Sequence, residues 1–116
     1  MSSTPALWHF TCEHGHAAIG RHGVLLPNAH PWLTEPLIWL TTEQWPDRFA
    51  SGLTSERLTC DRMRYRYRVT DSEHAEPWLG SRYRHDARRA VIADLESYGD
   101  PEHWWVSSHP LPARLA

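Results

Sequence analysis

The chain has no lysine, only two cysteines and no long apolar run. The absence of such a run argues against a transmembrane helix, which needs roughly 20 apolar residues. The segment Met1–Pro5 lacks the charged and apolar parts of a signal peptide, so we expect a cytoplasmic protein that does not associate with membranes. Cys12 and Cys60 fit a reducing compartment as thiols, and a disulfide between them stays open.

Several common functional motifs are also missing. The sequence contains no glycine-rich phosphate loop, no dinucleotide fingerprint, no paired-cysteine zinc pattern and no serine nucleophile elbow. All 12 basic residues are arginine, but the net charge is −2, which gives no general attraction to nucleic acid or membrane. With 116 residues, we expect one domain over residues 1–116, with loose ends at 1–5 and 113–116.

Alternating and apolar segments predict a β-sheet. The clearest alternation runs from Arg62 to Val69, where arginine occupies every second position and Met63, Tyr65, Tyr67 and Val69 occupy the others. We expect the second set to be buried and the arginines to face solvent or a ligand, because burying unpaired charges costs several kcal/mol per ion, an order-of-magnitude figure. The predicted strands are Leu7–Thr11, Leu37–Thr41, Met63–Val69 and His103–Ser107.

Helices are predicted between these strands. Gly15 and Gly23 bracket a helix of about two turns, and Thr41 and Gln44 have the spacing of a capping box that would begin a short second helix. Apolar residues recur every four positions in Ser81–Tyr98, which predicts one long helix. The fold class is therefore α+β: one small domain with a mainly antiparallel, split β-sheet and two or three helices.

The arginine face has two interpretations. Four guanidinium groups spaced about 7 Å apart repel one another unless anions lie between them. They can bind phosphate groups, for which Arg64 and Arg66 are the candidates, or they can pair with Asp and Glu of neighbouring elements. The excess of acidic over basic residues favours internal pairing.

A metal site is suggested by residue type but not by spacing. His9, Cys12, His14 and His16 are possible zinc ligands. They lack the second pair of ligands, two to four residues apart, that structural zinc sites use. We therefore expect no metal at these residues.

Three short motifs together resemble the ADP-ribosyltransferase fold. The first is Trp8-His9-Phe10-Thr11, the second is the apolar strand with Trp39, and the third is Glu102-His103-Trp104-Trp105-Val106. Their order is similar to that of the poly(ADP-ribose) polymerase-like enzymes, the DNA-modifying ADP-ribosyltransferase toxins and the RNA 2′-phosphotransferases. The chain departs from the polymerase-like pattern at Phe10, where glycine is usual, and at Trp39, where tyrosine is usual.

The resemblance implies a function in which NAD is the substrate. It implies that His9 and Thr11 bind NAD, that Trp39 stacks on nicotinamide, and that Glu102 stabilises the positive charge of the departing ribose. It also implies that His9 and Glu102 line one cleft. ADP-ribose would pass to a nucleic acid or protein acceptor, as in a toxin or a phage effector.

Two other functions stay open. The first is a non-catalytic module that binds a protein or a nucleotide through its tryptophan- and arginine-rich surface. The second is a small metal protein that uses the His and Cys residues near the N-terminus. A cleft shared by His9 and Glu102 would favour the transferase, whereas a cleft without Glu102 would favour the binding module. The oligomeric state is not indicated by the sequence.

Overall fold

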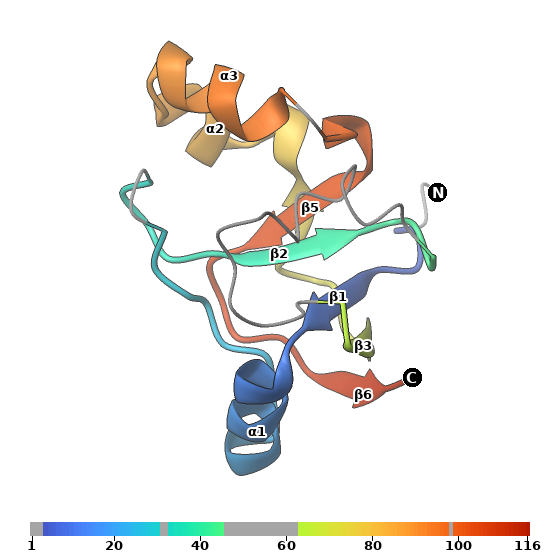
Figure 1. Ribbon diagram of the computed structural model, residues 1–116. Helices are drawn as coiled ribbons and strands as arrows, with labels where there is room; N and C mark the ends of the chain where they lie inside the picture. Colours follow the sequence, from blue (N-terminus) through green and yellow to red (C-terminus); the bar gives the residue numbers. More distant parts are fainter. Residues whose placement is uncertain (1–3, 31–32, 46–62, 98) are drawn as a thin grey trace.

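The computed structural model describes residues 4–30, 33–45, 63–97 and 99–116 (Figure 1). None of the helices in these ranges is long and apolar enough to cross a membrane. In chain order the described elements are β1 (Trp8–Thr11), α1 (Glu13–His22), β2 (Ile38–Thr41), β3 (Tyr65–Val69), β4 (Glu76–Pro77), η1 (Trp78–Gly80), α2 (Arg82–Asp86), α3 (Arg89–Glu96), η2 (Pro101–His103), β5 (Trp104–Ser107) and β6 (Ala113–Leu115).

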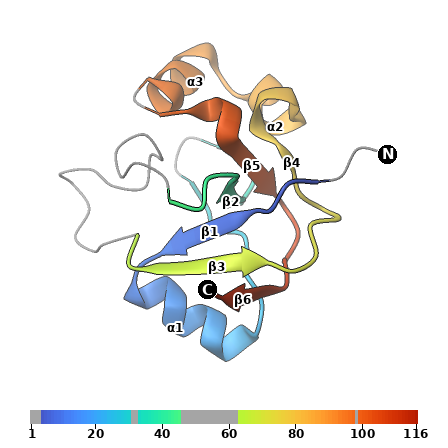
Figure 2. The ribbon, with the colours of Figure 1, turned by 90° about the vertical axis from the view of Figure 1, so that its right-hand side faces the viewer.

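The strands of the described residues form one antiparallel sheet in the order β4-β5-β2-β1-β3-β6. The predicted α+β class is therefore confirmed, and each of the four predicted strands contributes to the sheet. Helix α1 lies beside the β1-β3-β6 half, while α2 and α3 lie beside the β4-β5-β2 half (Figures 1 and 2). The N-terminal strand β1 is thus in the interior of the sheet, next to both β2 and β3.

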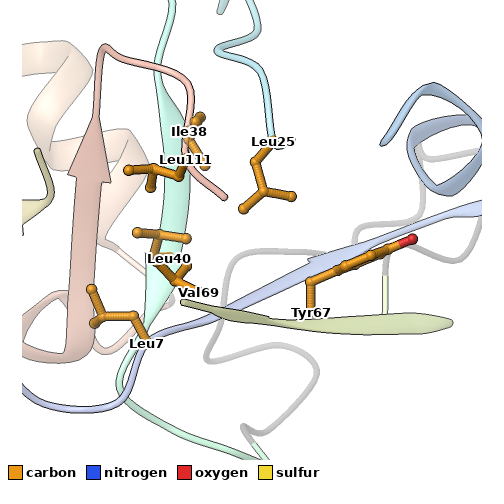
Figure 3. Close-up of a cluster of buried hydrophobic side chains, with 7 residues drawn as sticks. All are labelled: Leu7, Leu25, Ile38, Leu40, Tyr67, Val69 and Leu111. Carbon is orange, nitrogen blue, oxygen red and sulfur yellow. The ribbon is translucent and has the colours of Figure 1, made fainter. Parts of the chain in front are cut away.

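The sheet buries a separate apolar cluster on each face. Successive residues of a strand point to opposite faces, so Ile38 and Leu40 of β2 join one cluster while Leu37 and Trp39 join the other. The first cluster gathers side chains from β2, β3, the residue before β1 and two loops (Figure 3): Leu7, Leu25, Ile38, Leu40, Tyr67, Val69 and Leu111. The second cluster centres on Trp78, which is fully buried.

The alternation predicted for the arginine-rich strand is confirmed in the second half of β3, where Tyr67 and Val69 are buried and Arg68 is exposed. Met63 and Tyr65, which the alternation predicts to be buried, are half-buried, as is Arg66. The strand begins at Tyr65, two residues later than predicted. Arg62 lies outside the described residues.

The single helix predicted over Ser81–Tyr98 is wrong. Ala87 and Arg88 are extended, so the segment forms α2 and α3 separately. In a continuous helix, the 12-residue separation of Arg84 and Glu96 would correspond to about 18 Å along the axis. The break lets the chain fold back, so that Arg84 Nε donates to Glu96 Oε1 at 2.8 Å and the buried Trp78 Nε1 donates to the same oxygen at 3.3 Å.

Three smaller expectations also need correction. The C-terminal segment is not loose, because Ala113–Leu115 pairs with β3 as the edge strand β6. No helix begins at Thr41, which instead ends β2 and accepts a hydrogen bond on Oγ1 from the Glu43 backbone N–H at 3.1 Å. The helix expected between Gly15 and Gly23 begins two residues earlier, at Glu13, and ends at the left-handed Gly23 as predicted. Residues 46–52 and Cys60 lie outside the described ranges.

Replacing Trp78 with alanine is expected to destabilise the domain by about 3–5 kcal/mol, because it removes a buried indole and leaves a cavity. Its neighbour Leu79 is 46% exposed, so Leu79→Ala should cost less than about 1 kcal/mol. Urea unfolding followed by circular dichroism measures both free energies. Equal losses for the two variants would show that Trp78 is not central to the second cluster.

Candidate functional site

The sheet is weakly joined between β1 and β2. Among the described residues, the register of these strands contains one pair, Trp8 with Thr41. Beyond this pair the strands separate toward the C-terminal end of β1 (Figure 1). The His9 side chain spans the separation, because its Nδ1–H donates to the Trp39 backbone oxygen at 2.9 Å. The sequence predicted a split β-sheet. The structure has one sheet whose strands β1 and β2 pair at one end and separate at the other.

His9 is held in one neutral form by this environment. Burial lowers the pKa of His9 below its ordinary value of 6.5, and the hydrogen bond to the Trp39 carbonyl opposes this only in part. Since a carbonyl oxygen can only accept, the proton of the neutral ring lies on Nδ1. Nε2 is then an acceptor, suited to a hydroxyl group.

A cavity of about 780 Å³ lies in the opening between β1 and β2 and extends along α1. Its walls include residues that point to opposite faces of the same strand, such as His9 and Phe10 on β1. The lining also includes residues 24–30, which follow α1, Leu95 of α3 and Trp104 of β5. Cavities of about 300–1,000 Å³ are the usual size for small-molecule and cofactor sites.

The cavity favours an anionic or neutral ligand. Among the described residues that line it there is no Asp or Glu, whereas histidine occurs at positions 9, 14, 22 and 30. The first turn of α1 also contributes, since Cys12, His14 and Gly15 are in the lining. Cys12 is the N-cap of this ten-residue helix but its side chain makes no capping hydrogen bond. Helix N-termini carry unsatisfied backbone N–H groups and attract phosphate groups.

Thr11 is positioned by a close approach of α1 to β1. A Cβ atom added at Gly15 would clash with Thr11 Oγ1. Glycine at this position therefore allows the helix to pack against the threonine hydroxyl, and both residues line the cavity. Gly20, one turn further along the same helix, has no atom within 4 Å of an added Cβ.

Trp39 lies at the boundary between the cavity and the second apolar cluster. Its ring centroid is 5.0 Å from that of Trp78 and 5.9 Å from that of Trp104, with the Trp104 ring nearly perpendicular. These contacts fix the indole in one orientation, and half-burial leaves part of it accessible. Trp39 also lines the cavity.

The structure brings three of the predicted site residues together and leaves the other three elsewhere. His9, Thr11 and Trp39 line the same cavity, whereas Glu102, Arg64 and Arg66 are not in its described lining. Arg64 forms an ion pair with Glu13, and Arg66 lies over the rings of two tryptophans.

Glu102 is the one exposed residue of η2 and lies two residues before the cavity-lining Trp104. Its carboxylate makes no hydrogen bond or ion pair with the described part of the chain. The neighbouring His103 is fixed, since Nδ1 is 2.8 Å from Thr42 Oγ1 and Nε2 is 3.2 Å from Glu43 Oε1. Glu102 is thus held near the cavity by its backbone, with its side chain in solvent.

Sequence reasoning did not identify the segment 24–30 as a wall of the site. Leu25 pairs with Leu111, and Asn28 pairs with Leu37, through isolated β-bridges. These bridges hold the segment over the opening between the strands. The available signal was Gly23 followed by two apolar residues, which marks a helix end that turns back onto the sheet.

The residues considered as zinc ligands have other contacts. His16 stacks on Tyr65 with centroids 3.9 Å apart, and its Nδ1 is hydrogen-bonded to the Tyr67 hydroxyl. Burial raises the pKa of Tyr67, which keeps this hydroxyl protonated. Within the described residues, no group of three or more His, Cys, Asp or Glu side chains is arranged to hold a metal ion.

Comparison with known proteins identifies no relative. No protein-family model, no curated protein and no solved structure matches this chain. The function is therefore proposed from the resemblance of its short motifs together with the geometry and chemistry of the described residues.

Replacing Gly15 with alanine should displace Thr11 and destabilise the domain, whereas Gly20→Ala should stabilise it by up to about 1 kcal/mol through helix propensity. Chemical denaturation of both variants measures the difference. The double variant Thr11→Ala/Gly15→Ala removes the clashing hydroxyl and should recover part of the loss. Equal effects of Gly15→Ala and Gly20→Ala would contradict the close approach.

The burial of His9 predicts a stability that falls at acidic pH. Because its folded-state pKa is lowered, the unfolded chain binds a proton below about pH 6.5 that the folded chain excludes. Its contribution is therefore complete above that pH and is lost as the pH falls toward the folded-state pKa. The change in unfolding free energy between about pH 7.5 and about pH 5.5 should be smaller in His9→Gln.

The control for this experiment is His85→Gln, which removes an exposed histidine of α2. The pH dependence of its stability should match that of the unmodified protein. A His9→Gln variant with the same pH dependence as His85→Gln would refute the burial argument.

Proposed function

We propose that this chain binds NAD in the cavity between β1, β2 and α1 and transfers its ADP-ribose group to an acceptor. The observation that supports this most is the convergence of His9, Thr11 and Trp39 on one cavity of about 780 Å³. These are the residues to which the resemblance assigns NAD binding. His9 and Thr11 come from β1 and Trp39 comes from β2, and the opening of the sheet between these strands brings them to one cavity. We also propose that the protein acts in the cytoplasm.

Each residue has a specific part in this proposal. His9 Nε2 accepts a hydrogen bond from a ribose hydroxyl, because Nδ1–H is already bonded to Trp39. Trp39 provides an aromatic surface for the nicotinamide ring. The diphosphate lies toward the first turn of α1, where backbone N–H groups and the absence of carboxylates in the described lining favour negative charge.

The reaction breaks the glycosidic bond between the ribose carbon and the nicotinamide nitrogen. The bonding electron pair leaves with nicotinamide, which becomes neutral, and positive charge develops on the ribose. The acceptor supplies the electron pair for the new bond and releases its proton to solvent water. Glu102 is proposed to stabilise the positive charge, with its solvent-exposed side chain moving toward the cavity beside Trp104.

A second function is favoured by the position of Glu102. A non-catalytic module that binds a nucleotide needs the cavity but not the carboxylate, and Glu102 is not in the described cavity lining. The two functions differ in one measurable respect, which is whether bound NAD loses nicotinamide. Both require that NAD binds.

The proposal is tested by titrating the protein with NAD by calorimetry and by measuring nicotinamide release with and without candidate acceptors. His9→Ala should weaken NAD binding by about tenfold through the loss of one polar contact. Glu102→Gln should lower nicotinamide release by about a hundredfold or more and change the affinity little. The control is Glu73→Gln, which alters an exposed carboxylate between β3 and β4.

The outcomes separate the two functions. Binding followed by release that depends on Glu102 supports the transferase. Binding without release in the unmodified protein supports the binding module. A protein that does not bind NAD at millimolar concentration has neither function.

A further inference from the structure

A second surface of the sheet is rich in arginine and tryptophan. We define the Arg–Trp surface by Trp8, Trp45, Arg66, Arg68 and Arg114. Trp8 is directly opposite Arg68 across β1 and β3, and Arg68 is directly opposite Arg114 across β3 and β6. Directly paired residues project from the same face of a sheet, so these three side chains form a row across three strands.

The charges of this row are not neutralised within the described residues. Other arginines have carboxylate partners, as in the pairs Arg64–Glu13, Arg82–Glu35 and Arg84–Glu96. No described carboxylate forms an ion pair with Arg66, Arg68 or Arg114. Like charges directly opposite each other destabilise a sheet, so Arg68 opposite Arg114 favours an anion between them. Among the described residues, the internal pairing expected from the overall composition does not occur at these three arginines.

The surface is hollowed at this point. A depression of about 430 Å³ is bounded by Trp8, Arg68, Thr70 and Arg114, together with the C-terminal residues Leu115 and Ala116. Arg68 and Arg114 are both exposed. Two guanidinium groups at one depression offer the paired N–H donors through which arginine binds a phosphate group.

Trp45 extends the surface beside this depression. The Arg66 guanidinium lies 3.8 Å from the centroid of the Trp45 ring and 4.8 Å from that of Trp8. Arg66 also donates from Nη1 to the Gln44 backbone oxygen at 3.2 Å, which fixes the segment that carries Trp45. The Trp45 residue is nevertheless 76% exposed. Arg66 therefore acts as a positioning residue for an indole that faces solvent.

We propose that the Arg–Trp surface binds single-stranded nucleic acid. A base stacks on Trp45, and a neighbouring phosphate lies between Arg68 and Arg114. Proteins bind single strands with exposed aromatic rings next to arginines. The rings stack on the flat faces of the bases, and the arginines pair with the negative charge of each nucleotide. An acidic peptide would use the arginines but would leave the exposed indole without a role. The net charge of −2 means that any such binding depends on this local surface rather than on the whole protein.

This proposal is independent of NAD binding. Of the five residues of the Arg–Trp surface, only Trp8 is also in the described cavity lining. The His9→Ala variant should therefore bind an oligonucleotide as the unmodified protein does. Either proposal can fail while the other holds.

The test measures the fluorescence anisotropy of a labelled oligothymidine strand titrated with the full chain at several salt concentrations. Arg68→Ala/Arg114→Ala should weaken binding by about tenfold or more and reduce the slope of log affinity against log salt by about 0.7, since the two arginines share one phosphate and each phosphate contact to a single strand contributes about 0.7. Trp45→Ala should weaken binding by about tenfold through the loss of stacking. Circular dichroism checks that each variant is folded.

The matched control is Arg88→Ala/Arg89→Ala. It removes the same two charges from exposed positions around the start of α3, and its affinity should stay within about threefold of the unmodified protein. Equal losses in the two double variants would overturn the proposal in favour of general charge attraction. Stronger binding of polyglutamate than of the oligonucleotide would overturn it in favour of an acidic peptide. The absence of binding at low salt, or displacement by millimolar phosphate at constant ionic strength, would also overturn it.

Discussion

The hydrogen bond from His9 to the Trp39 carbonyl is the interaction on which the site depends. It joins two strands at the place where their backbones no longer pair. A regular ladder there would close the space between β1 and β2, whereas a side-chain bridge keeps the strands connected and leaves a cavity. The same bond fixes the tautomer of His9, so the structural link and the proposed ligand contact use the two nitrogens of one ring.

Glu96 has a comparable role on the other face of the sheet. Its carboxylate accepts hydrogen bonds from the buried Trp78 and from Arg84. Glu96 thereby accepts the hydrogen bond of the Trp78 indole N–H and connects α3 to α2 through Arg84. The second cluster is consequently ordered around Trp78. Trp39 packs against Trp78, and this contact fixes the Trp39 indole at the edge of the cavity.

The four inner strands of the sheet were predictable because their signals are local, whereas the short edge strands β4 and β6 were not predicted. The alternation around Tyr67 and the apolar strand that contains Trp39 depend only on which face of a strand is buried. The break at Ala87 was not predictable from the sequence. The apolar residues of α2 and α3 together have the periodicity of one helix, and the ion pair that accompanies the break joins Arg84 to Glu96, twelve residues away. The same limit applies to the site: His9, Thr11 and Trp39 were found through short motifs, but the wall at 24–30 depends on bridges to Leu37 and Leu111.

The two edges of the sheet bear on how copies of this protein behave at high concentration. Strand β4 has two residues, one of which is Pro77 and lacks an N–H, and β6 has three residues with the charged Arg114 at its centre. Long, flat, apolar edges are templates for a strand of another molecule. These edges are short, interrupted and charged, so the described sheet offers little backbone for intermolecular β-pairing. We therefore expect little association between copies of this protein through the described sheet edges, while Arg114 on β6 stays exposed.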